Sequence, residues 1–448
     1  MYSIRKVWRR FRLANDWPQN PAPREGFRRK TLGEASVSMN VRARQHWVVV
    51  LVVFGIAAAV EGLGVSQIFA FMPLYLRGMG MPEADIPQWV GWLNSLIFIF
   101  GLPLVPLWGV WADKYSRKAI IARSALVEAI VYLLVALSRQ PWQLGGSLLL
   151  VGFQLGNTGV MLGALRDVTP PRRLGTAIAI FSATSPIGFA AGPALGSLMV
   201  DGWHTSLSSV YALSALLSVA VVGLLALGLQ EVRPEVVPTG RTVDLAYGAI
   251  KGVFTDITTR RLFTVFGIAV LARFMTNPFL PLVTEHVSGS QVELASAIAL
   301  VVGTAALAGG LISPIAGAVG DRIGFRPVLV ASLVGFGAML FLMPDAPSVP
   351  LLALLSAAAS MFNGGVGAMI FGLLAMEVPP QQRSATLNLV YFPLYIAGIV
   401  GPAVGALVVR AGLPVVFSLS GLVLGLGAVY AVARLGRSGG TPQEVARQ

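Results

Sequence analysis

The sequence contains no cysteine and only three histidines among its 448 residues. The absence of cysteine excludes disulfide frameworks, thiolate metal sites and cysteine nucleophiles. The histidines His46, His204 and His286 all fall at the predicted ends of hydrophobic segments, so they offer no buried imidazole relay. The chain also lacks an HExxH motif. We therefore expect no metal, no cofactor and no catalytic site, which argues against an intramembrane enzyme.

Charged residues are scarce, at 12% of the chain, while 55% of the residues are hydrophobic and the mean hydropathy is +0.74. A soluble core does not accommodate this composition, but a lipid bilayer does. Twelve hydrophobic segments of roughly 20 residues, each long enough to cross the bilayer, can be counted. They start near residues 47, 88, 119, 143, 175, 208, 262, 293, 327, 349, 385 and 413. The predicted fold class is an all-α integral membrane protein.

The net charge of +13 is distributed very unevenly across these segments. Of the 33 lysines and arginines, 29 fall on the side of both termini, and only Arg77, Arg139 and Arg410 fall on the other. This bias places both termini and the central loop in the cytoplasm, with the protein in the cytoplasmic (inner) membrane. Basicity therefore indicates anionic lipid as a partner, and no nucleic acid is required.

The segments divide the chain into two halves joined by one long connection. Tyr247, Ile250, Phe254 and Ile257 are spaced three, four and three residues apart in that connection, which predicts an amphipathic helix at the membrane surface. The basic N-terminal tail can be read as a surface helix or as a disordered segment, and no cleavable signal is predicted. The predicted parts are a tail (1–45), a six-helix bundle (46–230), a linker (231–261), a second six-helix bundle (262–435) and a C-terminal tail (436–448).

Four short patterns recur in the same order, 208 or 209 positions apart. "GVWADKYSRK" returns as "GAVGDRIGFR", "FMPLYL" as "FLPLVT", "PPRRLGTA" as "PPQQRSAT", and "GFAAGPALG" as "GIVGPAVG". A constant offset of this kind is the signature of an internal repeat. The sequence therefore predicts two pseudo-symmetric six-helix bundles.

The first recurring pattern is a charged turn between hydrophobic segments. Its basic residues suit the headgroup region, but topology does not require the acids Asp113 and Asp321. A carboxylate at this place can accept hydrogen bonds from the start of a neighbouring helix. Such a contact can form in one arrangement of the bundles and break in another, so we interpret both turns as cytoplasmic latches.

These turns resemble the signature of the major facilitator superfamily, Gly-x-x-x-Asp-Arg/Lys-x-Gly-Arg-Arg/Lys. Ser116 replaces the usual Gly in the first turn, and Phe325 replaces an Arg in the second. The resemblance implies two bundles that rock about a central site, with Asp113 steadying the outward-facing state against the start of the eleventh span near Ser384. The matching residues are Gly109, Asp113, Lys114, Arg117 and Lys118, then Gly317, Asp321, Arg322, Gly324 and Arg326.

A second motif in the fifth span, Gly188, Gly192, Pro193 and Gly196, is similar to the motif of proton-driven antiporters in that family. Small residues four apart also allow close helix packing, and the proline bends the helix at the expected seam between the halves, so both interpretations stay open. The arginine that many drug exporters carry in the fourth span is missing, since the region reads "LLVGFQLGNTG". Proton coupling is therefore not assigned to that position.

Glu61, Glu128 and Arg273 fall near the middle of spans, where a charge costs ~2.5–3.5 kcal/mol. Glu61 is the strongest candidate for a proton carrier, although it could instead be hydrogen-bonded within its bundle. Arg273 is interpreted as its ion-pair partner or as a group that binds an anionic substrate. For Glu128 a structural hydrogen bond, for example to Asn94, is the preferred interpretation.

Amide side chains complete the predicted cavity, on spans that line the central site in the family. Each could instead hold helices together. The amides are Gln154, Asn157, Asn277 and Asn363.

The sequence therefore predicts a monomeric secondary transporter that exports amphipathic organic compounds in exchange for protons by alternating access. Uptake or facilitated transport of a small metabolite or a lipid is the alternative. A membrane sensor that does not transport is a more remote one.

Overall fold

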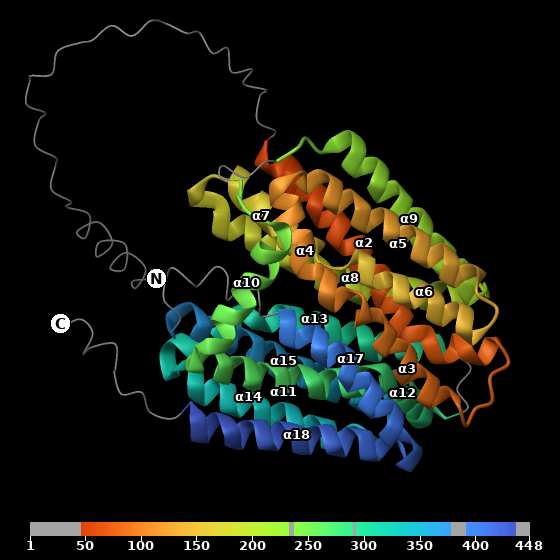
Figure 1. The fold of residues 1–448 in the computed structure, drawn as a ribbon. Helices are drawn as coiled ribbons and strands as arrows, with labels where there is room; N and C mark the ends of the chain where they lie inside the picture. Colours follow the sequence, from red (N-terminus) through yellow and green to blue (C-terminus); the bar gives the residue numbers. More distant parts are fainter. Residues whose placement is uncertain (1–45, 233–236, 290–292, 378–390, 436–448) are drawn as a thin grey trace, which may run out of the picture. The chain divides into compact units, whose positions relative to one another are not determined.

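The computed structural model describes residues 46–232, 237–289, 293–377 and 391–435. Both predicted tails, 1–45 and 436–448, lie outside these ranges. Over the described ranges the chain is helical and contains no strand, and twelve helices are long and apolar enough to cross a membrane. The prediction of an all-α membrane protein with twelve spans is confirmed, and the helices form the two bundles seen in Figure 1.

The first bundle contains six spans, two of which are interrupted. The second span breaks at Phe100, and the fourth breaks at Leu155 and Gly156. The helices are α2 (Trp47–Gly78), α3 (Ile86–Ile99) with α4 (Gly101–Lys114), α5 (Arg117–Leu137), α6 (Pro141–Gln154) with α7 (Asn157–Val168), α8 (Leu174–Ser197) and α9 (Leu207–Gly228).

The second bundle repeats this arrangement, with one interruption near Asn277 in its first span. The eleventh span is described from Tyr391 onward, so its predicted start near Ser384 lies outside the described residues. The helices are α11 (Ile257–Thr276) with α12 (Leu280–Ser288), α13 (Leu294–Ile323), α14 (Phe325–Leu342), α15 (Val349–Glu377), α17 (Tyr391–Val408) and α18 (Leu413–Arg434).

The spans are apolar on every side, as expected for helices that lipid surrounds. Large aliphatic side chains face outward, among them Leu227, which is 93% exposed, and Leu426, which is 70% exposed. The buried side of α2 carries glycine, serine and Gln67 among its apolar residues. Polar side chains are therefore turned inward, where other helices can bond to them.

The two bundles meet along two helix pairs, α8 with α13 and α3 with α17. Glycines allow the close approach in the second pair. A Cβ atom added to Gly91 would lie 2.7 Å from the carbonyl oxygen of Pro402, and one added to Gly398 would lie 2.7 Å from the ring of Phe98. Phe98 also packs edge-on against Phe274, with ring centroids 5.0 Å apart.

The linker contains the helix α10 (Thr242–Thr255), which packs on α4 of the first bundle. The hydroxyl of Tyr247 donates to the carbonyl of Pro103, and Lys114 donates to the carbonyl of Gly240 at 2.5 Å. The side chains of Ile250 and Phe254 lie outside the described part. Ile257, expected on the same helix face, instead begins α11, because Asp256 is extended and caps that helix.

Candidate functional site

Glu61 lies at the middle of α2 and faces the interior of the first bundle. Asn157 Nδ2 donates a hydrogen bond of 2.9 Å to Glu61 Oε2. The predicted ion pair with Arg273 is wrong: no ion pair joins these two residues within the described structure, and the cation that acts on Glu61 is Arg123 of α5. Glu61 is therefore engaged within its own bundle and makes no bond across the central seam in this structure.

Asn157 is the first residue of α7, immediately after the break in the fourth span. Leu155 has an extended backbone (ψ 155°), and Gly156 has a φ of +94°, a left-handed value that favours glycine. The break leaves the last carbonyls of α6 and the first N–H groups of α7 without helical partners. Broken helices in the middle of a membrane create polar sites of this kind in transporters.

Arg123 occupies the other side of the break. Its Nη2 lies 3.4 Å from the carbonyl oxygens of both Gln154 and Leu155, so a cation caps the C-terminal end of α6. Its guanidinium carbon lies 3.7 Å from the centre of the Trp108 ring, which is a cation–π contact. Ser124 donates to the same Gln154 carbonyl.

Sequence reasoning missed Arg123 because its position near the predicted start of the third span placed it among the headgroup arginines. The signal that could have identified it is its place on the helix. It follows Arg117 by six residues and precedes Glu128 by five, so it lies almost two turns inside the span.

Glu128 lies one turn before Tyr132 on α5, and both side chains are almost fully buried. Ser218 and Tyr132 lie near the Glu128 carboxylate, and the charge of Glu61 also acts on it. The Tyr132 ring fills the space above Gly64 of α2, where an added Cβ would lie 2.3 Å from it. The suggested bond to Asn94 is wrong, because the Asn94 amide donates to the Val90 carbonyl at 2.7 Å and to the Met72 sulfur.

The remaining predicted cavity residues belong to the second bundle and stay apart from Glu61. Arg273 is half-buried on α11, Asn277 is exposed at the interruption that follows, and Asn363 is half-buried on α15. Gln154 and Asn157, by contrast, lie at the break beside Glu61. The structure therefore brings together the acid and the two amides of the first bundle.

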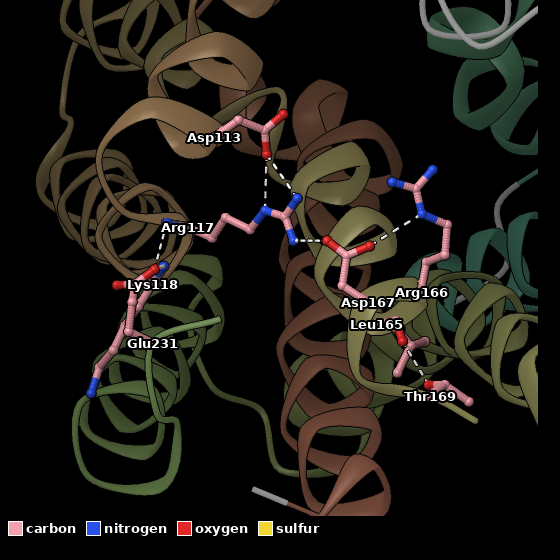
Figure 2. Close-up of polar contacts among 8 residues, drawn as sticks. All are labelled: Asp113, Arg117, Lys118, Leu165, Arg166, Asp167, Thr169 and Glu231. Atoms are coloured by element: carbon pink, nitrogen blue, oxygen red, sulfur yellow. Dashed lines mark hydrogen bonds and ion pairs between the residues drawn. The ribbon is translucent and has the colours of Figure 1, made fainter. Parts of the chain in front are cut away.

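The first charged turn forms a network of polar contacts where α4 ends and α5 begins (Figure 2). Arg117, whose side chain is 5% exposed, bonds to Asp113 at 2.8 Å and to Asp167 of α7 at 2.7 Å. Arg166 contacts the same Asp167 at 3.3 Å. Asp113 of α4 is thus held by Arg117, the first residue of α5, and its predicted partner near Ser384 lies outside the described residues.

Glu231 and Lys118 tie the ends of two helices together in the same region. Glu231 Oε1 accepts from the backbone N–H of Arg117 at 2.9 Å, and its other oxygen accepts from the Ser116 hydroxyl. Lys118 donates to the carbonyls of Ala226 and Leu229 at the end of α9. An acid at the start of α5 and a base at the end of α9 both complement the helix dipoles.

The two turns differ at the position of the signature glycine, which is Ser116 in the first turn and Gly324 in the second. Ser116 has an extended backbone and accepts a bond of 2.9 Å from the Ala119 N–H, so it caps α5. Gly324, its counterpart, has a φ of +97° and turns the chain directly from α13 into α14. The side chain of Asp321 is exposed and bonds to none of the described residues.

The glycines of the fifth span pack α8 against α2, within the first bundle. Added Cβ atoms would lie 2.0 Å from the Ala59 carbonyl oxygen at Gly188, 2.3 Å from the Leu63 carbonyl oxygen at Gly192, and 2.3 Å from the Phe71 ring at Gly196. The seam to the second bundle instead uses the other side of α8. An added Cβ at Gly310 of α13 would lie 2.5 Å from Pro186. The fifth span therefore lies at the seam between the bundles, while its motif glycines face α2.

Contacts between the bundles gather at the ends opposite to Trp47 and Arg434. Arg77 bonds to Glu285 of the second bundle at 2.8 Å. Arg410 Nη2 donates to Gln88 Oε1 at 2.7 Å. Asp201 Oδ2 accepts from both the N–H and the hydroxyl of Ser296, at 2.7 Å each. The bundles are therefore closed at this end.

An apolar groove with a volume of about 340 Å³ lies between α11 and α17. Phe263, Leu271, Phe392 and Pro393 form part of its wall, and Arg260 and Thr264 are its polar members. This volume is at the lower end of the range for small-molecule sites. No group of three or more acidic or histidine side chains able to hold a metal occurs among the described residues.

The profile of the Major Facilitator Superfamily matches residues 54–289 and 262–447. The chain belongs to this superfamily. It is therefore a transporter of small molecules and not an enzyme. The resemblance inferred from the two charged turns is confirmed.

Similar proteins include bacterial multidrug transporters. The chain is 27% identical over 402 residues to the multidrug resistance protein MdtG of Enterobacter lignolyticus (strain SCF1), covering 88% of this chain and 94% of that protein. It is 26% identical over 394 residues to MdtG of Salmonella typhi, covering 86% and 95%. With twelve spans and bacterial relatives of this kind, the chain is a multi-pass protein of the inner membrane.

Solved structures share the fold at low sequence identity. A bacterial homolog of the human lysosomal transporter Spinster, in an inward-facing and occupied conformation, has a TM-score of 0.72 at 15% identity, covering 86% of this chain and 96% of that one. The nucleoside transporter NupG has a TM-score of 0.69 at 18% identity, covering 87% and 98%.

Proposed function

We propose that this protein exports amphipathic organic compounds in exchange for protons, and that Glu61 is the residue that takes up and releases the proton. The observation that carries the proposal is the Glu61–Asn157 bond at the break in the fourth span. An acid in the middle of a span is costly in hydrocarbon, so its presence argues for a function. Asn157 is neutral, so its bond does not fix the carboxyl group in one protonation state as a salt bridge would.

The proposed transport cycle is alternating access, in which the two bundles rock about their seam. Support comes from the contacts Arg77–Glu285 and Asp201–Ser296, which join the two bundles at one end. The excess of lysine and arginine on the side of the termini supports a cytoplasmic location for the other end. This structure then corresponds to a state that is closed to the outside.

The proposed substrates are compounds with a large apolar part. The groove between α11 and α17 offers aromatic and aliphatic walls with one arginine among them, which suits such molecules. The similarity to MdtG over 88% of the chain supports export of several compounds rather than uptake of one metabolite.

The test is a flux assay in proteoliposomes with an imposed proton gradient. We expect substrate to accumulate against its gradient and a protonophore to abolish this. Glu61→Gln keeps the size of the side chain and its bond to Asn157 but cannot titrate, so we expect it to fold, to bind substrate and to lose proton-driven flux. Gradient-driven flux that is unchanged in Glu61→Gln would refute the role of Glu61. Flux indifferent to the gradient in the unmodified protein would support facilitated transport instead.

A further inference from the structure

The buried polar groups at the break in the fourth span are only partly satisfied. Gln154 is 1% exposed, and neither of its amide atoms has a hydrogen-bond partner among the described residues. Arg123 Nε and Nη1 and Trp108 Nε1 are also buried there without partners. Unpaired buried donors are costly, and such groups in a native protein call for an explanation.

These unpaired donors lie on one side of Glu61. Asn157 bonds to Glu61 from the α7 side of the break, whereas Gln154 and Arg123 lie on the α6 side. The Gln154 amide is near the Glu61 carboxyl but forms no bond to it in this structure. The Trp108 ring and the carbonyls of Gln154 and Leu155 contact the Arg123 guanidinium and hold it at the break. The Gln154 amide and the donors of Arg123 and Trp108 therefore lie together on this side of Glu61.

We propose that Arg123 is a positioning residue for proton exchange at Glu61, and that the ionised Glu61 carboxylate turns from Asn157 towards Gln154 and Arg123. The inference rests on the proposed function, because it takes Glu61 as the exchanging acid. The Glu61 O–H bond breaks, the proton leaves as hydronium in water, and the bonding pair stays on the carboxylate oxygen. Arg123 keeps its own proton and charge throughout.

The charges around Glu61 favour this arrangement. From α5, the cation Arg123 and the ionisable Glu128 and Tyr132 act on Glu61 or on one another. The neighbouring helices α8 and α9 carry no charged residue. Arg166 and Asp167 belong to α7 but lie at its far end. Arg123 is thus the cation available to an ionised Glu61, and fourth-span residues supply the neutral donors.

Infrared spectroscopy of the full chain in lipid nanodiscs can follow the Glu61 carboxyl directly. The protonated carboxyl band is assigned by its loss in Glu61→Gln and is then titrated with pH. Removing a nearby cation disfavours the carboxylate, so Arg123→Gln should move the midpoint of proton release upward by about one pH unit. Arg123→Lys keeps the charge and should move it less. Arg166→Gln, which removes an exposed arginine of the same bundle, is the matched control and should not move it.

A midpoint in Arg123→Gln equal to that of Arg166→Gln would overturn the inference. If Arg123→Gln is not produced as folded protein, two other variants test the inference. Trp108→Phe removes the indole N–H and keeps an aromatic ring against Arg123. Gln154→Leu removes the side-chain amide and keeps a similar volume. Both should then raise the midpoint, and unchanged midpoints in both would also overturn it. The titration does not depend on transport, so the two proposals can fail separately. A raised midpoint in Arg123→Gln, together with flux that is independent of the proton gradient, would contradict the proposed function. The effect of Arg123 on proton release at Glu61 would then still hold.

Discussion

Arg77 of α2 bonds to Glu285 of α12 across 2.8 Å, which joins the two bundles by an ion pair. The same guanidinium holds Glu83, in the turn that follows α2, at 2.5 Å. This bond lowers the pKa of the Glu83 carboxyl below its usual value. Arg77 thus forms one ion pair within the first bundle, with Glu83, and one between the bundles, with Glu285. Only the ion pair with Glu285 must break if the bundles separate at this end.

Loss of the Arg77–Glu285 pair should shift the protein towards the state that is open at this end. Glu285→Gln removes the pair between bundles, and Glu83→Gln, the matched control, removes only the pair within the first bundle. A partly exposed ion pair is worth about 0.2–1 kcal/mol, so we expect the ratio of closed to open molecules to fall by up to about five-fold.

The measurement for this pair is the distance between spin labels on Trp142→Cys and His286→Cys. Both positions are exposed and the natural chain has no cysteine, so labelling is specific. Equal distance distributions for Glu285→Gln and Glu83→Gln would show that the ion pair does not hold the ends together.

Arg117 should matter far more to stability than Arg166, although both contact Asp167. Arg117→Gln leaves Asp113 and Asp167 facing each other without the guanidinium between them. We expect a loss of about 1–3 kcal/mol, less than for a fully buried pair because Asp113 is 40% exposed. Arg166→Gln changes an exposed side chain and should cost less than about 0.5 kcal/mol. Unfolding of both variants in detergent by denaturant gives the comparison, and equal losses would contradict it.

Close packing of α8 on α2 makes Gly192 intolerant of any side chain. Gly192→Ala places a methyl group against the Leu63 carbonyl and the Ser66 hydroxyl, so we expect a loss of about 1–3 kcal/mol. Gly223→Ala in α9 meets open space and should be neutral or stabilise by up to about 1 kcal/mol. Melting temperatures of the two variants in detergent test this difference. If Gly192→Ala were as stable as Gly223→Ala, α8 and α2 could move apart enough to accommodate the methyl group, which would contradict the prediction.

Asp256 should make the start of α11 sensitive to acid. Its Oδ2 accepts from the Thr259 N–H at 2.7 Å, and hydrogen bonds from Thr259 lower its pKa despite partial burial. A lowered pKa stabilises the folded state above about pH 4, and this contribution disappears as the pH falls through the folded-state value. Asp256→Ala should cost about 1 kcal/mol at pH 7 and nothing at the acid end.

The measurement for Asp256 is hydrogen exchange of the first amides of α11 as a function of pH. Asp256→Asn keeps an acceptor oxygen at the cap and is the control that should remove the pH dependence without removing the protection. Protection that falls in acid equally in Asp256→Asn and in the unmodified protein would assign the effect to another group.

Sequence patterns predicted the spans well because apolar length is a local property of the chain. Predicted starts at residues 47, 349 and 413 coincide with the observed helix starts, and most others lie within four residues. The interruptions at Phe100 and Gly156 were not predicted, since both halves of each broken span remain apolar and the hydropathy signal runs through them.

The candidate site was predicted only in part, for a different reason. Glu61, Gln154 and Asn157 stand out because polar residues are rare within apolar segments. Their partners depend on which helix faces lie together, and this is not a local property. For that reason Arg273 was paired with Glu61 and Glu128 with Asn94, while Arg123 was assigned to the headgroups. A long arginine side chain can reach inward from a position near the helix start. The position of Arg123 in the sequence therefore does not show where its guanidinium lies.

The linker is hydrogen-bonded to the first charged turn at two places. Glu231 accepts from the backbone N–H of Arg117 at the start of α5, and the carbonyl of Gly240 accepts from Lys114. Beyond these, α10 rests on α4, and Asp256 alone separates it from α11. In the proposed rocking motion, a movement of the second bundle relative to α10 would require backbone rotation at Asp256 or a displacement of α10 along α4. Asp256, which caps the start of α11, would then also serve as a hinge residue between α10 and the second bundle.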